Sequence, residues 1–165
     1  MWILVLFEYY KTSSWWSLIV NFAISGLLCA SIWYFSVPAS LCKLIEQFVN
    51  NSTSVLSLLV GFTVTLFTLL ITASNPSIDE IKNLDSNYIL YSKNVSVYRI
   101  LLIRTAYIIV IESLLLLFNL LFPFLFQSTT TAGKILFFID AFLMTHIILV
   151  NITGTVDLYF VLTKD

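Results

Sequence analysis

Residues 54–73 read SVLSLLVGFTVTLFTLLITA, an apolar stretch without a charged residue or a proline. A helix needs about 20 such residues to cross the hydrocarbon core of a bilayer, where it pairs its own backbone amides without water. Three further stretches meet this requirement, at residues 15–36, 100–126 and 135–162. The sequence therefore predicts an all-α, polytopic integral membrane protein with four transmembrane helices, in a single membrane domain over residues 1–165.

The overall composition agrees with this fold class. The chain is 59% hydrophobic and 10% charged, with a net charge of -1, and its mean hydropathy is +0.98. Soluble domains carry about 25% charged residues, so the lipid bilayer is the expected surroundings of this chain. With so little net charge, no direct contact with nucleic acid is predicted.

The first connection between spans has the pattern of a short interfacial helix. Pro38 interrupts the chain after the first span, and apolar residues then recur at helical spacing at Leu41, Leu44, Ile45 and Phe48. This pattern indicates a short amphipathic helix lying in the outer interface of the membrane. An ordinary amphipathic linker is the alternative.

The second connection, residues 77–97, is predicted to be a juxtamembrane helix. Pro76 stops the preceding span, and Ser77 with Glu80 has the pattern of a capping box. One face of this helix is apolar and carries Ile78, Ile81, Leu84, Tyr88 and Tyr91. We expect this face to dock a soluble protein, and a solvated helix without a partner is the alternative.

The distribution of basic residues predicts the orientation. With four spans, the N-terminus, the second connection and the C-terminus share one compartment. That side holds Lys11, Lys82, Lys93, Arg99 and Lys164, whereas the other side holds Lys43 and Lys134. Because cytoplasmic loops carry the excess of Lys and Arg, both termini are predicted to be cytoplasmic.

Small and hydroxyl-bearing residues lie on a single face of the second span. Their spacing is three or four residues, and they are Ser54, Ser57, Gly61, Thr65, Thr68 and Thr72. Small side chains let helix backbones approach closely in a bilayer, so this face is predicted to pack against another helix or another subunit. A pore lining is the alternative.

Polar residues in the third and fourth spans should turn inward, because ionisable groups in lipid are costly unless they are paired. The short connection at residues 127–133 makes these spans an antiparallel hairpin, so residues equally far from the turn lie at the same depth. Three polar layers are predicted: Arg104 with Asp157, Asn119 with Asp140, and Glu112 with Asn151 and, within reach, His146.

Glu112 has no basic residue at its own depth. It is expected to be either protonated or exposed to water in a central cavity. His146 is a lone imidazole, so a hydrogen-bonded core histidine is favoured over a metal ligand, and no metal or other cofactor is predicted. The chain has no nucleophile elbow, phosphate-binding glycine loop, HExxH or CxxC pattern, so it is not expected to be an enzyme.

The chain resembles the small membrane subunits of bacterial anti-phage systems, most closely the KwaA family of the Kiwa system. The resemblance rests on the four-span layout over nearly the whole chain, and on residues 58–65 leading into residues 68–72 and then a polar amphipathic segment. It implies a homo-oligomer, a tetramer, in the bacterial inner membrane. It also implies a soluble, DNA-binding, KwaB-like partner in the cytoplasm.

The leading hypothesis is a non-enzymatic membrane sensor or scaffold that couples a membrane event to that partner. Two alternatives stay open. One is a small proton- or ion-coupled transporter, in which Glu112 binds a proton while His146 and Asp140 line the route. The other is a pore-forming effector that depolarises the membrane.

Overall fold

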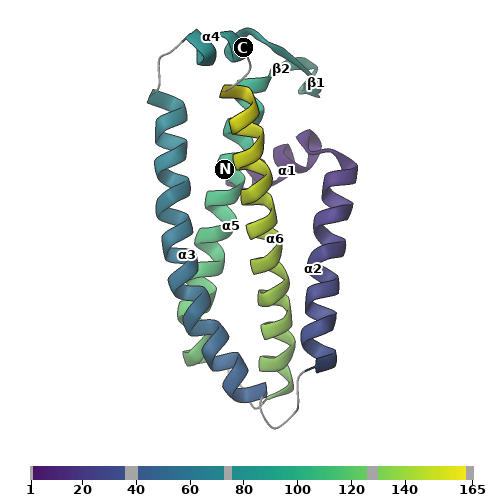
Figure 1. Ribbon diagram of the computed structural model, residues 1–165, viewed down its shortest axis with the longest axis vertical. Helices are drawn as coiled ribbons and strands as arrows, with labels where there is room; N and C mark the ends of the chain where they lie inside the picture. Colours follow the sequence, from purple (N-terminus) through teal and green to yellow (C-terminus); the bar gives the residue numbers. More distant parts are fainter. Residues whose placement is uncertain (1, 36–40, 73–75, 126–129, 163–165) are drawn as a thin grey trace.

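The computed structural model of the chain describes residues 2–35, 41–72, 76–125 and 130–162. Within these residues the chain forms mostly helices, together with one two-stranded sheet (Figure 1). The elements are α1 (Trp2–Thr12), α2 (Trp15–Phe35), α3 (Leu41–Thr72), α4 (Pro76–Asn83), β1 (Asp85–Leu90), β2 (Lys93–Ser96), α5 (Val97–Leu125) and α6 (Thr131–Leu162).

Four helices are long and apolar enough to cross a membrane. They are α2, α3, α5 and α6, which agrees with the four predicted spans. The helix bounds differ from the predicted ones mainly at α3, which begins at Leu41, and at α5 and α6, which begin at Val97 and Thr131.

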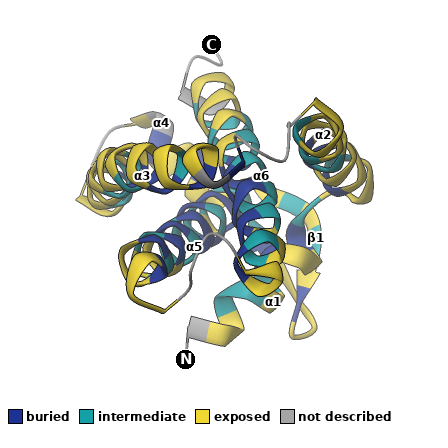
Figure 2. Cartoon of the chain, turned by 90° about the horizontal axis from the view of Figure 1, so that it is seen from below, coloured by how far each residue is buried: buried dark blue, intermediate teal, exposed yellow. Residues whose placement is uncertain are grey.

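The hairpin of α5 and α6 forms the centre of the molecule. Helix α3 packs along α5, and α2 packs against α6. Seen along the bundle, the buried residues gather where α3, α5 and α6 meet, while the outer faces of all four long helices are exposed (Figure 2). Helix α1 also packs on α5, where the Tyr9 and Tyr107 rings stack with their centroids 3.7 Å apart.

The separate interfacial helix predicted after the first span is not present. Its residues form the first turns of α3, and their buried side chains, such as Ile45 and Val49, pack with Phe122 and Phe137. The polar run that follows does not interrupt the helix. The hydroxyls of its Thr and Ser residues bond to backbone carbonyls four residues earlier, so the helical conformation satisfies them.

The prediction of a helix over residues 77–97 is wrong beyond Asn83. After α4, the antiparallel strands β1 and β2 form a hairpin. Tyr91 and Ser92 join them with φ angles of 51° and 63°, the left-handed conformation that two-residue hairpin turns require. The fold is therefore helical with a small sheet, rather than all-α.

Candidate functional site

The polar residues of α5 and α6 form three layers along the central hairpin. In the layer nearest to β1 and β2, Arg104 and Asp157 form the predicted ion pair, and both side chains are partly exposed. In the layer farthest from the sheet, the amide of Asn119 donates a hydrogen bond of 3.0 Å to Asp140, and both residues are buried. Only a few residues separate α5 from α6, so residues equally far from this connection lie at one depth, which explains the register.

The middle layer is built around Glu112, which is fully buried. Its Oε1 accepts a hydrogen bond of 2.7 Å from the side-chain amide of Asn151, as predicted. The same oxygen lies 3.4 Å from the Thr63 hydroxyl, whose single proton it shares with the Leu59 carbonyl at 2.9 Å. Thr63 was not predicted to be a site residue, because it lies on the face of α3 opposite to the row of small residues. Three helices therefore meet at this carboxyl group.

Several polar atoms in these layers have no hydrogen-bond partner among the described residues. They are Glu112 Oε2, Asn119 Oδ1, Asp140 Oδ2 and His146 Nδ1. Buried polar atoms in folded proteins are nearly always bonded, so these four atoms are exceptions within a largely satisfied interior.

His146 does not join the layer of Glu112, which corrects the sequence prediction. Its Nε2 lies 3.3 Å from the Tyr107 hydroxyl, and its ring stacks on Phe22 with a centroid distance of 4.8 Å. His146 and Asn151 are five residues apart, which turns their side chains about 140° from each other around a helix. His146 therefore faces α2 and Tyr107 of α5, whereas Asn151 lies on the side of α3.

Tyr107 connects this histidine to the N-terminal helix. Its hydroxyl lies 3.3 Å from that of Tyr10, and its ring stacks on Tyr9. Burial raises the pKa of the Tyr9 hydroxyl, although Ser13 and Arg104 act in the opposite direction, so Tyr9 is neutral at pH 7. The cluster holds α1 on α5 through neutral groups.

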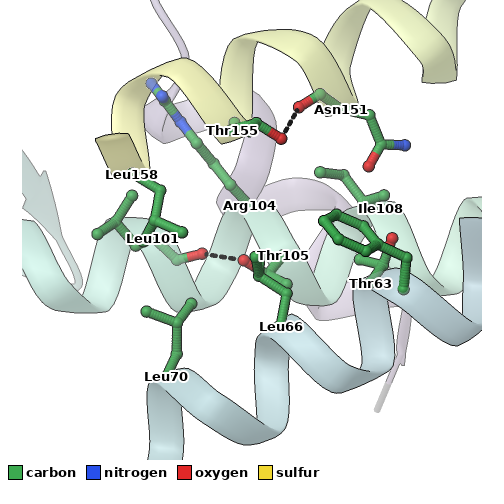
Figure 3. Close-up of a pocket in the computed structure, with 12 residues that line it drawn as sticks. Thr63, Leu66, Leu70, Leu101, Arg104, Thr105, Ile108, Asn151, Thr155 and Leu158 are labelled. Atoms are coloured by element: carbon green, nitrogen blue, oxygen red, sulfur yellow. Dashed lines mark hydrogen bonds between the residues drawn. The ribbon is translucent and has the colours of Figure 1, made fainter. Parts of the chain in front are cut away.

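Arg104 lines cavities on more than one side. One cavity, of about 10 Å³, lies between α3, α5 and α6 and is also lined by Thr63 and Asn151 (Figure 3). Another, of about 450 Å³, opens beside the sheet, where Asp85 and Asp157 line it together with Arg104. The ion pair therefore stands between the sheet and the buried middle layer.

The predicted packing face of α3 is exposed in the single chain. The face of α3 that packs on α5 carries the buried side chains of Leu56, Thr63 and Leu70. The small residues lie on the opposite side, and their hydroxyls bond to carbonyls of the same helix. The exposed residues are Ser57, Gly61, Thr65, Thr68 and Thr72.

The predicted docking residues do not share one face. Ile78 and Ile81 are buried within the chain, so a partner protein could not contact them directly. Leu84 lies between α4 and β1 and is exposed, Tyr91 is exposed at the hairpin turn, and Tyr88 is half-buried on β1. The chain leaves the helical conformation at Leu84, where α4 ends and β1 begins. The residues before and after this point therefore do not share the single face that one continuous helix would have given them.

Among the described residues, no three His, Cys, Asp or Glu side chains come together in a way that could hold a metal ion. No protein-family model, curated protein or solved structure matches this chain. The structure itself defines its class as a mostly helical protein with four helices long and apolar enough to cross a membrane. Its central helices are joined by three layers of polar residues.

Proposed function

We propose that this chain is a non-enzymatic subunit of a membrane complex, and that it assembles as a homo-oligomer through α3. The observation that carries the proposal is the exposed face of small residues on α3, which the single chain does not use for its own packing. Association of helices in a bilayer depends on close packing rather than on apolar burial, and small side chains permit it.

The details of this face suit a helix-helix contact. A side chain at Gly61 would meet nothing within 4 Å, so the surface there is open to a neighbour. The hydroxyls of Thr65 and Thr68 are already bonded to their own helix, at 2.8 and 2.9 Å, so covering them leaves no unsatisfied donor. A second copy of α3 can approach without breaking these bonds.

We place the four long helices across a bacterial inner membrane. In each of them, less than half of the most apolar stretch is buried within the chain, so most of its side chains require an apolar environment. Helix α4, the sheet and the C-terminal end of α6 lie at one end of the molecule (Figure 1). Lys82, Lys93 and Arg99 belong to this end, which favours a cytoplasmic location for it and for both termini.

The resemblance to KwaA supplies the biological part of the proposal. We propose that the oligomer, with four copies as the resemblance implies, couples a membrane event during phage infection to a soluble, KwaB-like partner. The docking surface for this partner is formed, in our proposal, by the exposed apolar side chains around the sheet. They are Leu84, Ile89 and Tyr91, with exposed fractions of 44%, 68% and 65%.

The assembly surface can be tested with Gly61→Leu in the full-length chain, reconstituted in nanodiscs or mild detergent. A leucine there should separate the helices and convert the oligomer to monomers, as measured by light scattering on the purified complex. Gly26→Leu on α2 is the matched control, since a side chain there also meets nothing within 4 Å. An oligomer of unchanged mass in Gly61→Leu, or equal loss in both variants, would refute assembly through α3.

A further inference from the structure

Glu112 has a buried oxygen atom that the proposed assembly does not explain. Its Oε1 accepts two hydrogen bonds, from Asn151 and Thr63, whereas Oε2 has no partner among the described residues. A carboxylate whose charge is buried and partly unsatisfied is strongly unfavourable in an apolar region. A proton on Oε2 removes that charge while Oε1 keeps both bonds.

Among the residues that the structure describes, no cation lies at the depth of Glu112 to neutralise it instead. Arg104 lies on the same helix, eight residues or about 12 Å nearer to the sheet, and is paired with Asp157. Helix α3 faces Glu112 with Thr63, and its charged residues, Lys43 and Glu46, lie in its first two turns.

On α6, Lys134 lies in the first turn and Tyr159 in the last, and two further titratable groups are engaged elsewhere. Asp140 is bonded to Asn119, and His146 is directed to Tyr107. Helix α2 has no charged residue. Glu112 therefore meets only neutral hydrogen-bond donors. They can stabilise the carboxylate that forms when the proton leaves, but they are too weak to keep Glu112 permanently charged.

Two cavities lie between the hydrogen-bonding partners of Glu112 and the sheet, and they suggest a route for that proton. The cavity of about 10 Å³ beside Thr63 and Asn151 has close to the volume that one water molecule requires. It shares Arg104 and Leu101 as lining residues with the cavity of about 450 Å³ that opens beside the sheet. Glu112 itself does not line the small cavity, but its hydrogen-bonding partners Thr63 and Asn151 do, and Arg104 and Leu101 line both cavities.

We propose that Glu112 is an exchangeable proton site, reached from the sheet end of the molecule through the cavity that Arg104, Thr63 and Asn151 line. In the exchange, the O–H bond of the carboxyl group breaks and the proton passes to a water molecule, which becomes hydronium. The carboxylate that remains is held by Asn151 and Thr63. The site goes beyond the proposed assembly and does not depend on it.

Infrared spectroscopy of the full-length chain in proteoliposomes can test this site. The carbonyl band of a protonated, buried carboxylic acid should be present in the natural chain and missing in Glu112→Gln. The measurement covers about pH 5 to about pH 9, and any loss of the band should come on raising the pH, because the acid then loses its proton. Absence of a Glu112-dependent band throughout this range would overturn the proposal.

The route is tested by exchange into D₂O, followed as a shift of the same band. Gly154 lines the cavity, and a side chain there would lie 3.6 Å from Ile108, so Gly154→Leu should fill the path. We expect exchange to slow about tenfold, equivalent to an added barrier of about 1.4 kcal/mol. The matched Gly26→Leu change should leave the rate unaltered, and equal rates in all three proteins would refute this route.

Labelling of the natural chain with dicyclohexylcarbodiimide is the alternative test of the proton site if the Glu112→Gln variant does not fold. This apolar reagent modifies protonated carboxyl groups, so Glu112 in the natural chain should be labelled, and the extent should fall as the pH rises. Mass spectrometry of the modified peptide identifies the residue. Labelling of other carboxyl groups with none at Glu112 would contradict the proposal, and neither readout depends on the oligomer.

Discussion

The three polar layers of the central hairpin differ in how well they satisfy their own groups. The Arg104–Asp157 pair is partly exposed, so water can complete its bonding. The Asn119–Asp140 pair is buried and has one bond between its members, with Asn119 Oδ1 and Asp140 Oδ2 unpartnered. Loss of either residue of the buried pair should therefore cost more than loss of a half-exposed partner.

Asn119→Leu tests the buried pair. It leaves the Asp140 carboxyl without its donor, and we expect the free energy of unfolding in mixed micelles to fall by about 1 to 2 kcal/mol. Combining it with Asp140→Leu should recover part of that loss, because the unsatisfied group is removed as well. Thr145→Val is the control, since its hydroxyl bonds to the Ala141 carbonyl of its own helix. Purely additive losses in the double variant would contradict a direct interaction.

The exposed pair is suited to a double-mutant cycle. Arg104→Gln, Asp157→Asn and their combination should give a coupling energy of about 1 kcal/mol or less, because solvent screens both charges. The coupling should weaken as salt is added. A coupling near zero at low salt would show that the two side chains do not interact in the membrane.

At the scale of elements, the hairpin of β1 and β2 depends on an unusual turn. Tyr91 and Ser92 both have positive φ angles although neither is a glycine. Side chains with a Cβ are disfavoured in this conformation, and two-residue turns of this kind prefer Asn followed by Gly.

Ser92→Gly should accordingly stabilise the hairpin, by about 0.5 to 1 kcal/mol. Ser92→Val should destabilise it, because a β-branched residue is strained at positive φ. Hydrogen exchange measured by mass spectrometry on residues 85–96 provides the comparison, with the peptides of α6 as an internal reference. Slower exchange in Ser92→Val than in Ser92→Gly would contradict this turn geometry.

The sequence predicted the features that depend on local composition or on the tight turn. The four long helices follow from runs of apolar residues, and the pairing of Arg104 with Asp157 follows from counting outward from the turn. The structure of the second connection could not be predicted in this way, because Ser77 and Glu80 indicate where a helix begins but nothing after them marks where it ends. Two-residue hairpin turns are recognised in a sequence mainly by glycine or asparagine, and residues 91 and 92 are Tyr and Ser, so the sequence did not indicate a hairpin there.

The rotation of each helix about its axis was also beyond sequence reasoning. Thr63 and Thr65 are both threonines in the same span, and only the packing of α3 on α5 shows that Thr63 reaches Glu112. For His146, depth suggested a place beside Glu112, whereas the packing of α2 directs it to Tyr107 and Phe22. Hydropathy determines which segments are helices, and contacts between helices determine which side faces inward.

At the scale of the whole molecule, the orientation proposed for the membrane can be measured by labelling with an impermeant thiol reagent. Ser92→Cys at the hairpin turn and Ala132→Cys in the first turn of α6 lie at opposite ends of the long helices, in a chain with Cys29 and Cys42 replaced by serine. We expect Ser92→Cys to react only in inverted vesicles and Ala132→Cys only in intact cells. The reverse pattern would invert the proposed topology, and labelling of both from one side would refute the four-span arrangement.

Helix α3 is one uninterrupted helix of 32 residues. At 1.5 Å per residue it is about 48 Å long, whereas the apolar core of a bilayer is about 30 Å thick. Its first turns, with Lys43 and Glu46, therefore extend beyond such a core, and they belong to the same helix that carries the small-residue face. In the proposed assembly, a displacement of these outer turns would be transmitted along α3 to its other end, beside α4 and the sheet.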